Sequence, residues 1–191
     1  MPQGSVLGPL LFLLYINDIS NSTDRGTFVL FADDTNIFVV GKTKRDTYDR
    51  ANTILKSVSL YMKVNELHIN MSKCCYMYFE NSKKVEHTES DDYDLQINNV
   101  PIKQVHSTRF LGVIIDDKLS WNHHIDYLVN KLKCQAGILN RIKDCVPKAH
   151  HRDLYYTLFE SHLSYGVSVW GGVSTNKLNP IFTIQKKCIL G

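Results

Sequence analysis

The sequence has few of the cysteine patterns that mark disulfide-rich or zinc-binding proteins. Its five cysteines are an odd number, Cys74 and Cys75 are neighbours, and no C-x-x-C pair occurs. Spacing of this kind indicates neither a disulfide framework nor a zinc ribbon. We therefore expect reduced thiols, as is usual inside cells.

The chain also lacks an apolar run long enough to cross a bilayer. The stretch VLGPLLFLLYI, residues 6–16, contains Pro9 and continues into Asn17 and Asp18. No basic segment precedes it and no small-residue cleavage site follows it, so it lacks the features of a signal peptide. We expect no membrane partner.

Net charge is small but unevenly distributed. Residues 1–100 carry 10 Lys+Arg and 13 Asp+Glu, a net of −3, whereas residues 101–191 carry 12 and 6, a net of +6. This pattern fits an ordinary solvated surface, and it equally fits a polyanion lying across an acidic and a basic part. At 191 residues with 43% hydrophobic content, the chain suits one domain, or one domain with a small helical appendage.

Hydrophobic periodicity predicts an α+β fold, mixed to about residue 115 and nearly all helical afterwards. The first half is expected to contain a buried helix (8–19), a hairpin (28–31 with 37–40), a helix opened by a Thr43–Asp46 capping box (43–65), strands (66–73 and 74–80), a polar loop (81–94) and a hairpin turning at Asn98-Asn99. The second half is expected to contain a strand (108–116), a helix (120–142), a helix starting at Pro147, a loop (166–180) and a last helix (181–190).

Two adjacent carboxylates, Asp33 and Asp34, lie in the polar loop between the two apolar runs of the first hairpin. Like charges this close repel each other unless one is protonated or a cation neutralises them. Carboxylate oxygens without a nearby thiolate or imidazole favour Mg²⁺ over zinc, and magnesium held by carboxylates serves phosphoryl and nucleotidyl transfer. The alternative is a solvated turn that happens to contain Asp-Asp.

Four segments in order resemble the reverse transcriptases of non-long-terminal-repeat retrotransposons of the jockey kind. Pro2-Gln3-Gly4-Ser5 is similar to motif B, and Phe31-Ala32-Asp33-Asp34 to motif C. Leu67, Asn70 and Lys73 are similar to motif D, with Cys74 where threonine is usual. Phe110-Leu111-Gly112 is similar to motif E, the primer grip, and residues 116–125 resemble the entry to the thumb.

This resemblance implies an RNA-directed DNA polymerase with a partial palm over residues 1–107 and a primer grip with a helical thumb over 108–191. It implies two Mg²⁺ ions, with Asp33 and Asp34 as metal ligands and Lys73 near the pyrophosphate. Phe31 would lie beside the primer end, and Pro2, Gln3, Gly4 and Ser5 against template and nucleotide. Phe110, Leu111 and Gly112 would hold the primer backbone. The implied partners are an RNA template, a DNA primer and deoxynucleotide triphosphates, and the implied location is the nucleus.

The third carboxylate of the family belongs to motif A, upstream of motif B, and motif B begins here at residue 2. We therefore expect this 191-residue polypeptide to be a palm-to-thumb fragment that is inactive alone. A non-catalytic nucleic-acid-binding remnant, a group II intron or retron relative, and an unrelated α+β domain with a chance Asp-Asp turn are the alternatives. The pairs His123-His124 and His150-His151 are interpreted as surface or phosphate-facing groups, since neighbours on a helix point about 100° apart.

Overall fold

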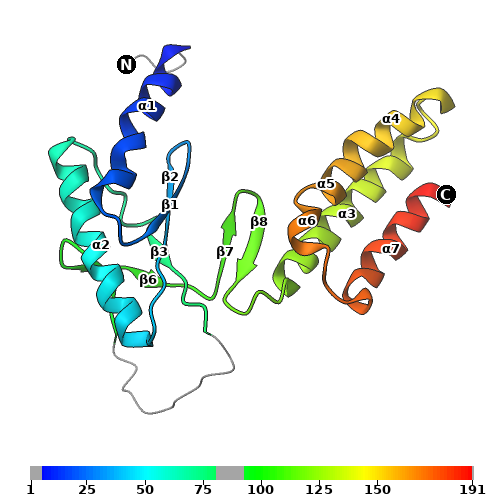
Figure 1. Ribbon diagram of the computed structural model, residues 1–191. Helices are drawn as coiled ribbons and strands as arrows, with labels where there is room; N and C mark the ends of the chain where they lie inside the picture. Colours follow the sequence, from blue (N-terminus) through cyan, green and yellow to red (C-terminus); the bar gives the residue numbers. More distant parts are fainter. Residues whose placement is uncertain (1–5, 81–92, 191) are drawn as a thin grey trace. The chain divides into compact units, whose positions relative to one another are not determined.

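A computed structural model describes residues 6–80 and 93–190 (Figure 1). The chain divides into two compact units. The first unit comprises residues 1–76 and 84–104, and the second comprises residues 77–83 and 105–191. Helices and strands are mixed in the first unit and helices dominate the second, as the hydrophobic pattern predicts.

The first unit combines two long helices with short strands. Its elements are α1 (Leu7–Asn17), a 3₁₀ turn (Asp18–Ser22), β1 (Thr27–Phe31), β2 (Asp34–Phe38), α2 (Lys44–Val64), β3 (Cys75–Tyr76), β4 (Gln96–Ile97), β5 (Val100–Pro101) and β6 (Lys103–Gln104). The pairs β1–β2 and β4–β5 are antiparallel, and β3–β6 is parallel. The β4–β5 hairpin turns at Asn98-Asn99, both with positive φ, which confirms the predicted turn.

The core of the first unit lies where the end of α1, the β1–β2 hairpin and α2 meet. A cluster of four buried residues holds them together: Ile16, Ile19, Ile54 and Val58. One face of the hairpin packs on this cluster through Phe28, Leu30, Ile37 and Val39. Alternation along the two strands accounts for this, because every second side chain of a strand points to the same face.

The prediction of a buried first helix is wrong in its burial, although the helix itself forms. Of the 11 residues of α1, all of them described, Ile16 alone is buried, and Leu14 is 65% exposed. A helix that is apolar on every side cannot turn all its faces toward a core reached only by its last turn. Among the described residues, no helix has both the length and the apolar character to cross a membrane.

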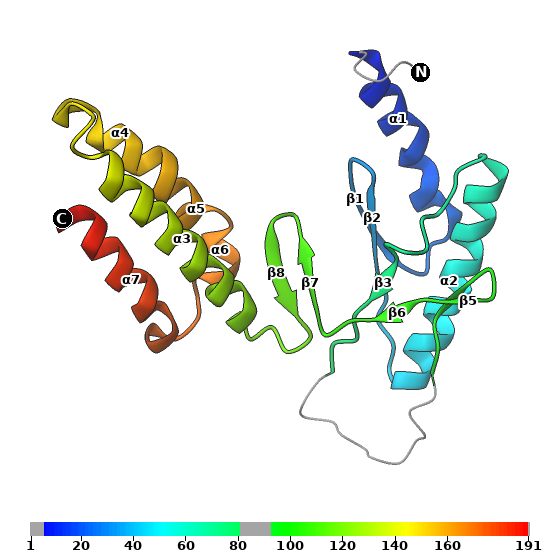
Figure 2. The same ribbon diagram turned by 180° about the vertical axis from the view of Figure 1, so that it is seen from behind.

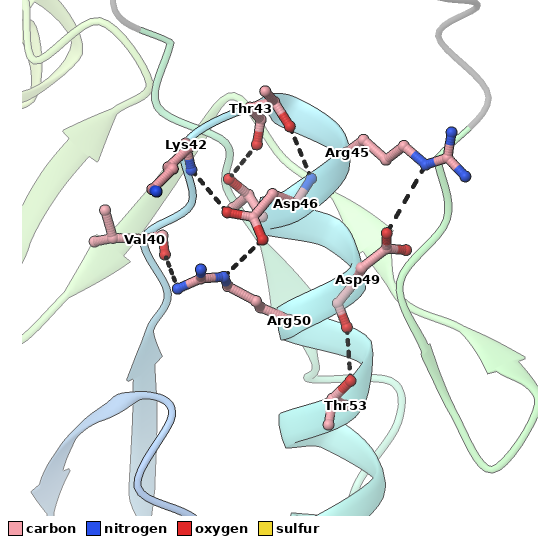
Figure 3. A network of polar contacts seen from close by, with 9 residues as sticks. Val40, Lys42, Thr43, Arg45, Asp46, Asp49, Arg50 and Thr53 are labelled. Atoms are coloured by element: carbon pink, nitrogen blue, oxygen red, sulfur yellow. Dashed lines mark hydrogen bonds and ion pairs between the residues drawn. The ribbon is translucent and has the colours of Figure 1, made fainter.

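The start of α2 is fixed by a polar network that also reaches the end of the hairpin (Figure 3). The Thr43 hydroxyl accepts the Asp46 N–H at 3.1 Å, while the Asp46 carboxylate accepts the Lys42 N–H and the Arg50 Nε–H, both at 2.8 Å. Arg50 also donates to the Val40 carbonyl at 3.4 Å. The Lys42 N–H and then Arg50 hold the pKa of Asp46 below its usual value. The capping box is confirmed, with Lys42 rather than Thr43 supplying the reciprocal N–H.

The second unit is a hairpin followed by packed helices. Its elements are β7 (Ser107–Phe110), β8 (Val113–Asp116), α3 (Asn122–Ile142), a 3₁₀ turn (Lys148–His150), α4 (His151–Tyr155), a π-helical segment (Tyr156–Glu160), α5 (Ser161–Ser164), α6 (Val167–Trp170) and α7 (Thr175–Leu190). Figures 1 and 2 show α7 and the α4–α5 stretch running beside α3. Eight buried residues form its core: Val113, Ile125, Leu128, Leu132, Phe159, Trp170, Ile181 and Ile184.

Several predicted elements differ from the observed ones. Residues 108–116 form the β7–β8 hairpin and not one strand, because the chain reverses at Leu111-Gly112. Residues 166–180, predicted as a loop, contain α6 and the start of α7. Pro180 lies inside α7, where burial of Ile181 and Ile184 outweighs one missing backbone hydrogen bond. Residues 66–73 form turns and irregular chain in place of the predicted strand, and the predicted strand 74–80 is reduced to Cys75–Tyr76. Most of the predicted 81–94 loop falls outside the described residues.

Candidate functional site

The two carboxylates lie at the tip of the β1–β2 hairpin. Phe31 pairs with Asp34, so the loop consists of Ala32 and Asp33 only. The predicted five-residue loop is thus too long, since Asp34 is already the first residue of β2. Ala32 has a φ of 50°, a left-handed conformation that costs energy for a residue with a Cβ. Both aspartates are exposed at this strained, tight turn.

The hairpin has one buried face and one exposed face, and Asp34 belongs to the exposed one. Cross-strand partners lie on the same face of an antiparallel pair, so Asp34 shares a face with Phe31. Phe31 is 57% exposed, and Val29 and Phe38 on this face are exposed as well. In Figures 1 and 2 the hairpin tip points the same way as the N-terminal end of α1. The tip therefore presents an aromatic ring and two carboxylates at one end of the first unit.

Lys73 lies in a tight turn that the side chain of Asn70 organises. The Asn70 amide oxygen accepts the Ser72 N–H at 3.2 Å and the Ser72 hydroxyl at 2.7 Å, and the Lys73 N–H donates to the Asn70 carbonyl at 3.0 Å. The Cys74 thiol donates to the same carbonyl at 3.3 Å. A threonine hydroxyl at this position could make the same bond, so the turn accommodates cysteine. Within the described residues, no ion pair joins Lys73 to Asp33 or Asp34, and its side chain is exposed.

The predicted primer-grip residues occupy the tip of the β7–β8 hairpin in the second unit. Phe110 pairs with Val113, which leaves Leu111 and Gly112 as a two-residue turn with φ of 44° and 85°. Positive φ at both positions is the sign pattern of a type I′ turn, which suits the twist of a hairpin. The segment that resembles motif E is therefore a compact turn, with Phe110 half-buried at its base.

The structure describes the predicted site residues in two separate units. Phe31, Asp33, Asp34 and Lys73 belong to the first unit, and Phe110, Leu111 and Gly112 belong to the second. Pro2, Gln3, Gly4 and Ser5 lie outside the described residues. Of the predicted set, the hairpin turn brings Asp33 and Asp34 together with Phe31.

Comparison with known proteins decides the family. A family model described as reverse transcriptase (RNA-dependent DNA polymerase) matches residues 1–115. This chain belongs to the reverse transcriptase family. Curated relatives agree: a probable RNA-directed DNA polymerase from transposon X-element of Drosophila melanogaster is 25% identical over 98% of this chain, and the polymerase of mobile element jockey from Drosophila funebris is 24% identical over 99%. The resemblance to polymerases of non-long-terminal-repeat elements is confirmed.

The chain spans about a fifth of the length of these two polymerases, 21% in each case. A third relative, the Pol polyprotein of type-1 retrotransposable element R1 from Bradysia coprophila, is 25% identical over 88% of this chain and 17% of its own length. No solved structure matches the chain.

Reverse transcriptases use divalent metal ions, and the tip of the β1–β2 hairpin supplies suitable ligands. Asp33 and Asp34 are adjacent, exposed, and offer only oxygen donors, which hard cations such as Mg²⁺ prefer. Among the described residues, no group of three or more histidine, cysteine, aspartate or glutamate side chains gathers around one point. The donor set here therefore fits a hard metal ion in chemical type.

Asp116 is not among the predicted site residues and is noted above only as the start of the segment that resembles the thumb entry. Asp116 is 5% exposed, and its carboxylate accepts the N–H groups of Lys118, Ser120 and Trp121 at 2.9–3.1 Å as well as the Ser120 hydroxyl at 3.1 Å. Burial raises the pKa of Asp116, but these hydrogen bonds outweigh burial and leave the pKa below its usual value. A D-x-x-x-S-W spacing before a helix could have revealed this cap.

The prediction that both histidine pairs are surface groups is wrong for His124. His124 is 3% exposed, and its Nδ1 accepts the Ile114 N–H at 3.3 Å, which joins α3 to β8. Its buried Nε2 has no hydrogen-bond partner among the described residues, and burial lowers the pKa of the ring. His123 and His150 are exposed, as expected, and His151 is half-buried against the Val146 carbonyl at 2.9 Å.

Proposed function

We propose that this chain forms the part of an RNA-directed DNA polymerase that carries the motif C carboxylates and the primer grip. Two adjacent, exposed carboxylates at the tip of a tight hairpin, in a chain of the reverse transcriptase family, carry the proposal. Residues 1–107 then correspond to part of the palm, and residues 108–191 to the primer grip and a helical thumb. The implied substrates are an RNA template, a DNA primer and deoxynucleotide triphosphates, and the site of action is the nucleus.

Each predicted residue has a defined part in this proposal. Asp33 and Asp34 hold divalent cations, which when bound activate the primer 3′-hydroxyl and stabilise the leaving pyrophosphate. Lys73 compensates charge near the pyrophosphate or donates a proton to it. Phe31 packs beside the primer end from the same hairpin face as Asp34.

The remaining residues hold nucleic acid. Phe110, Leu111 and Gly112 hold the primer backbone from the tip of β7–β8. Residues 2–5 (Pro2, Gln3, Gly4 and Ser5) lie against the template and the nucleotide, where Gly4 allows the backbone to approach without a Cβ in the way. The helices of residues 101–191, with their net charge of +6, grip the duplex through its phosphates with little sequence preference.

Metal binding at the hairpin tip can be tested directly on the 191-residue chain with Mn²⁺ as a paramagnetic probe. We expect signal broadening in nuclear magnetic resonance spectra to centre on Ala32–Thr35 and to disappear in the Asp33→Asn and Asp34→Asn variants. Asp24→Asn, which changes another exposed carboxylate of the same unit, is the matched control and should leave the broadening unchanged. Broadening spread evenly over the acidic surface would contradict a metal site at the tip.

Synthesis by this polypeptide alone is expected to be absent. The described residues bring two carboxylates together and no third, and nucleotidyl transfer depends almost wholly on positioning and charge stabilisation by the metal site. A primer-extension assay with Mg²⁺ and the 191-residue chain should therefore show no incorporation above a blank. Clear synthesis that Asp33→Asn abolishes would overturn this expectation and would show that two carboxylates suffice.

A non-catalytic nucleic-acid-binding role is the second candidate, and the net charge of +6 over residues 101–191 favours it. Binding of a recessed RNA–DNA hybrid by fluorescence anisotropy separates the two roles. A purely electrostatic binder loses affinity as the salt concentration rises, so Mn²⁺ should weaken its binding, and Asp33→Asn should not alter that response. A polymerase part should bind the primer end better with Mn²⁺ present, and this gain should vanish in Asp33→Asn.

A further inference from the structure

Tyr165 reaches the tip of the β7–β8 hairpin from the helical part of the second unit. It lies between α5 and α6, in none of the four motifs, and its hydroxyl donates a hydrogen bond to the Leu111 carbonyl at 2.7 Å. The two residues are 54 positions apart in sequence. Leu111 has positive φ, so this bond stabilises a peptide that is held in a sparsely populated conformation.

The ring of Tyr165 lies directly against Gly112, the second residue of the turn. A Cβ built on Gly112 would meet the Tyr165 Cε1 at 3.0 Å and its hydroxyl oxygen at 3.5 Å. With a φ of 85°, Gly112 also occupies a conformation that other residues rarely adopt. Glycine is therefore required here for two reasons, and one of them is the presence of Tyr165.

Tyr165 is itself fixed to the core. The buried indole of Trp170 donates from Nε1 to the Tyr165 carbonyl at 3.0 Å. The next residue, Gly166, has a φ of 64°, and a Cβ there would lie 3.1 Å from the Cγ2 of Val113 at the start of β8. The chain around Tyr165 thus contacts both the helical core and the hairpin, while Tyr165 as a whole residue is 56% exposed.

We propose that Tyr165 is a positioning residue that fixes the Leu111-Gly112 turn to the helical core. Through this turn it determines where the 3′ end of the primer lies. The part of this inference that concerns the primer rests on the proposed function. Because the hydroxyl holds the turn and the ring borders it, a change at Tyr165 should alter the placement of the primer terminus more than the affinity for duplex. A residue that served only overall stability would not produce this split.

The test compares Tyr165→Phe with the wild-type 191-residue chain in two measurements. Amide hydrogen exchange should become about fivefold faster at Leu111–Val113 in the variant, the factor expected for loss of one hydrogen bond, with no comparable change in α3. A recessed RNA–DNA hybrid with 2-aminopurine at the primer 3′ terminus should change its bound-state fluorescence. Its dissociation constant, measured by anisotropy, should stay within about twofold.

Two further variants sharpen the comparison. Tyr156→Phe is the matched control, because Tyr156 is an exposed tyrosine of the same unit whose hydroxyl has no hydrogen-bond partner among the described residues. It should behave like wild type in both measurements. Gly112→Ala should change both measurements at least as much as Tyr165→Phe, because its Cβ meets the Tyr165 ring and also strains the backbone at a φ of 85°.

The outcomes separate the inference from the function on which it rests. Unchanged exchange at the turn in Tyr165→Phe overturns the claim that Tyr165 fixes the turn. Faster exchange with unchanged 2-aminopurine fluorescence, in a chain that binds the hybrid, overturns its role in placing the primer. If the wild-type chain binds no hybrid, the proposed function fails, and hydrogen exchange alone then decides whether Tyr165 fixes the hairpin.

Discussion

The two units of this protein differ in how well their apolar side chains are covered. Eight buried residues form one cluster in the second unit, whereas the corresponding cluster of the first unit has four among the residues that the structure describes. The apolar side chains of residues 10–15 in α1 are exposed, as is Phe31 beside the carboxylates. The candidate metal ligands therefore belong to the unit whose apolar side chains are less well covered, and the predicted primer-grip residues belong to the unit with the larger buried cluster.

Leucine-to-alanine substitutions in the two units test this difference in coverage, and one of them is expected to have the largest effect on stability. Leu132 in α3 is completely buried, so Leu132→Ala removes packed atoms and leaves a cavity that costs about 3 kcal/mol of unfolding free energy. Leu14 in α1 is 65% exposed, so Leu14→Ala should change the unfolding free energy by less than about 0.5 kcal/mol. Urea unfolding followed by circular dichroism measures both.

A large loss of stability in Leu14→Ala would break the comparison, because it would mean that α1 is covered in solution. Sedimentation velocity then shows whether self-association supplies the cover. In that case the loss of stability should grow smaller on dilution, since the unfolding of an oligomer depends on protein concentration.

The sequence predicted elements where local chemistry and periodicity agree, and failed where packing decides. The capping box at Thr43, the turn at Asn98-Asn99 and the hairpin around Asp33 each depend on residues within a few positions, and each was found. Pro180 and the β7–β8 reversal were missed. A proline inside a helix and a turn that begins with leucine oppose local preference, and contacts distant in sequence stabilise both.

The candidate site shows the same limit. Short motifs pointed to Asp33, Asp34 and Lys73 without any knowledge of packing, because their chemistry lies in residue type and order. The burial of His124 and the reach of Tyr165 to Leu111 depend on how α3 and α6 pack on the hairpin. A single sequence contains no direct record of such contacts.

A smaller effect is expected at Asp116, which caps the β8–α3 connection. Asp116→Ala leaves the N–H groups of Lys118, Ser120 and Trp121 without their acceptor. It should lower the unfolding free energy of the second unit by about 2 kcal/mol. Asp126, exposed on α3, is the control, and Asp126→Ala should be nearly neutral. Thermal unfolding of the second unit, followed by near-ultraviolet circular dichroism of its tryptophans, reports both variants.

The same carboxylate predicts a pH window. Its pKa is lower in the folded chain than the ordinary value of 3.8, so the unfolded chain binds the proton more readily. The stability that Asp116 contributes is therefore complete above about pH 4 and is lost as pH falls through the folded pKa. Asp116→Ala should flatten the acid limb of the stability profile, and an unchanged acid limb would contradict the assigned role.

The cap of α2 in the first unit is expected to contribute about 1 kcal/mol to the unfolding free energy. Thr43→Ala removes the side-chain acceptor of the Asp46 N–H and should lower the unfolding free energy by about this amount. Thr53→Ala, in the middle of the same helix, is the control and should be neutral or slightly stabilising, because alanine has the higher helix propensity. Equal losses in the two variants would show that the Thr43 hydroxyl does not act as a cap.

The smallest expected effect is the change in stability with pH that His124 causes. The direction of this change distinguishes a buried histidine from a surface one. Burial lowers the pKa of the folded ring below its ordinary value of 6.5, so the unfolded chain takes up a proton first as pH falls. The second unit should therefore lose stability as pH falls below about 6.5 and approaches the folded pKa. His124→Gln should reduce this slope, whereas His123→Gln, a change at an exposed neighbour, should leave it unchanged. Burial and then Lys131 also lower the pKa of His162 in the same unit, so part of the slope should persist in His124→Gln. A His124 titration midpoint above 6.5 in a nuclear magnetic resonance experiment would instead mean that the charged ring has a stabilising partner. It would also mean that water reaches the contact between His124 on α3 and Ile114 on β8.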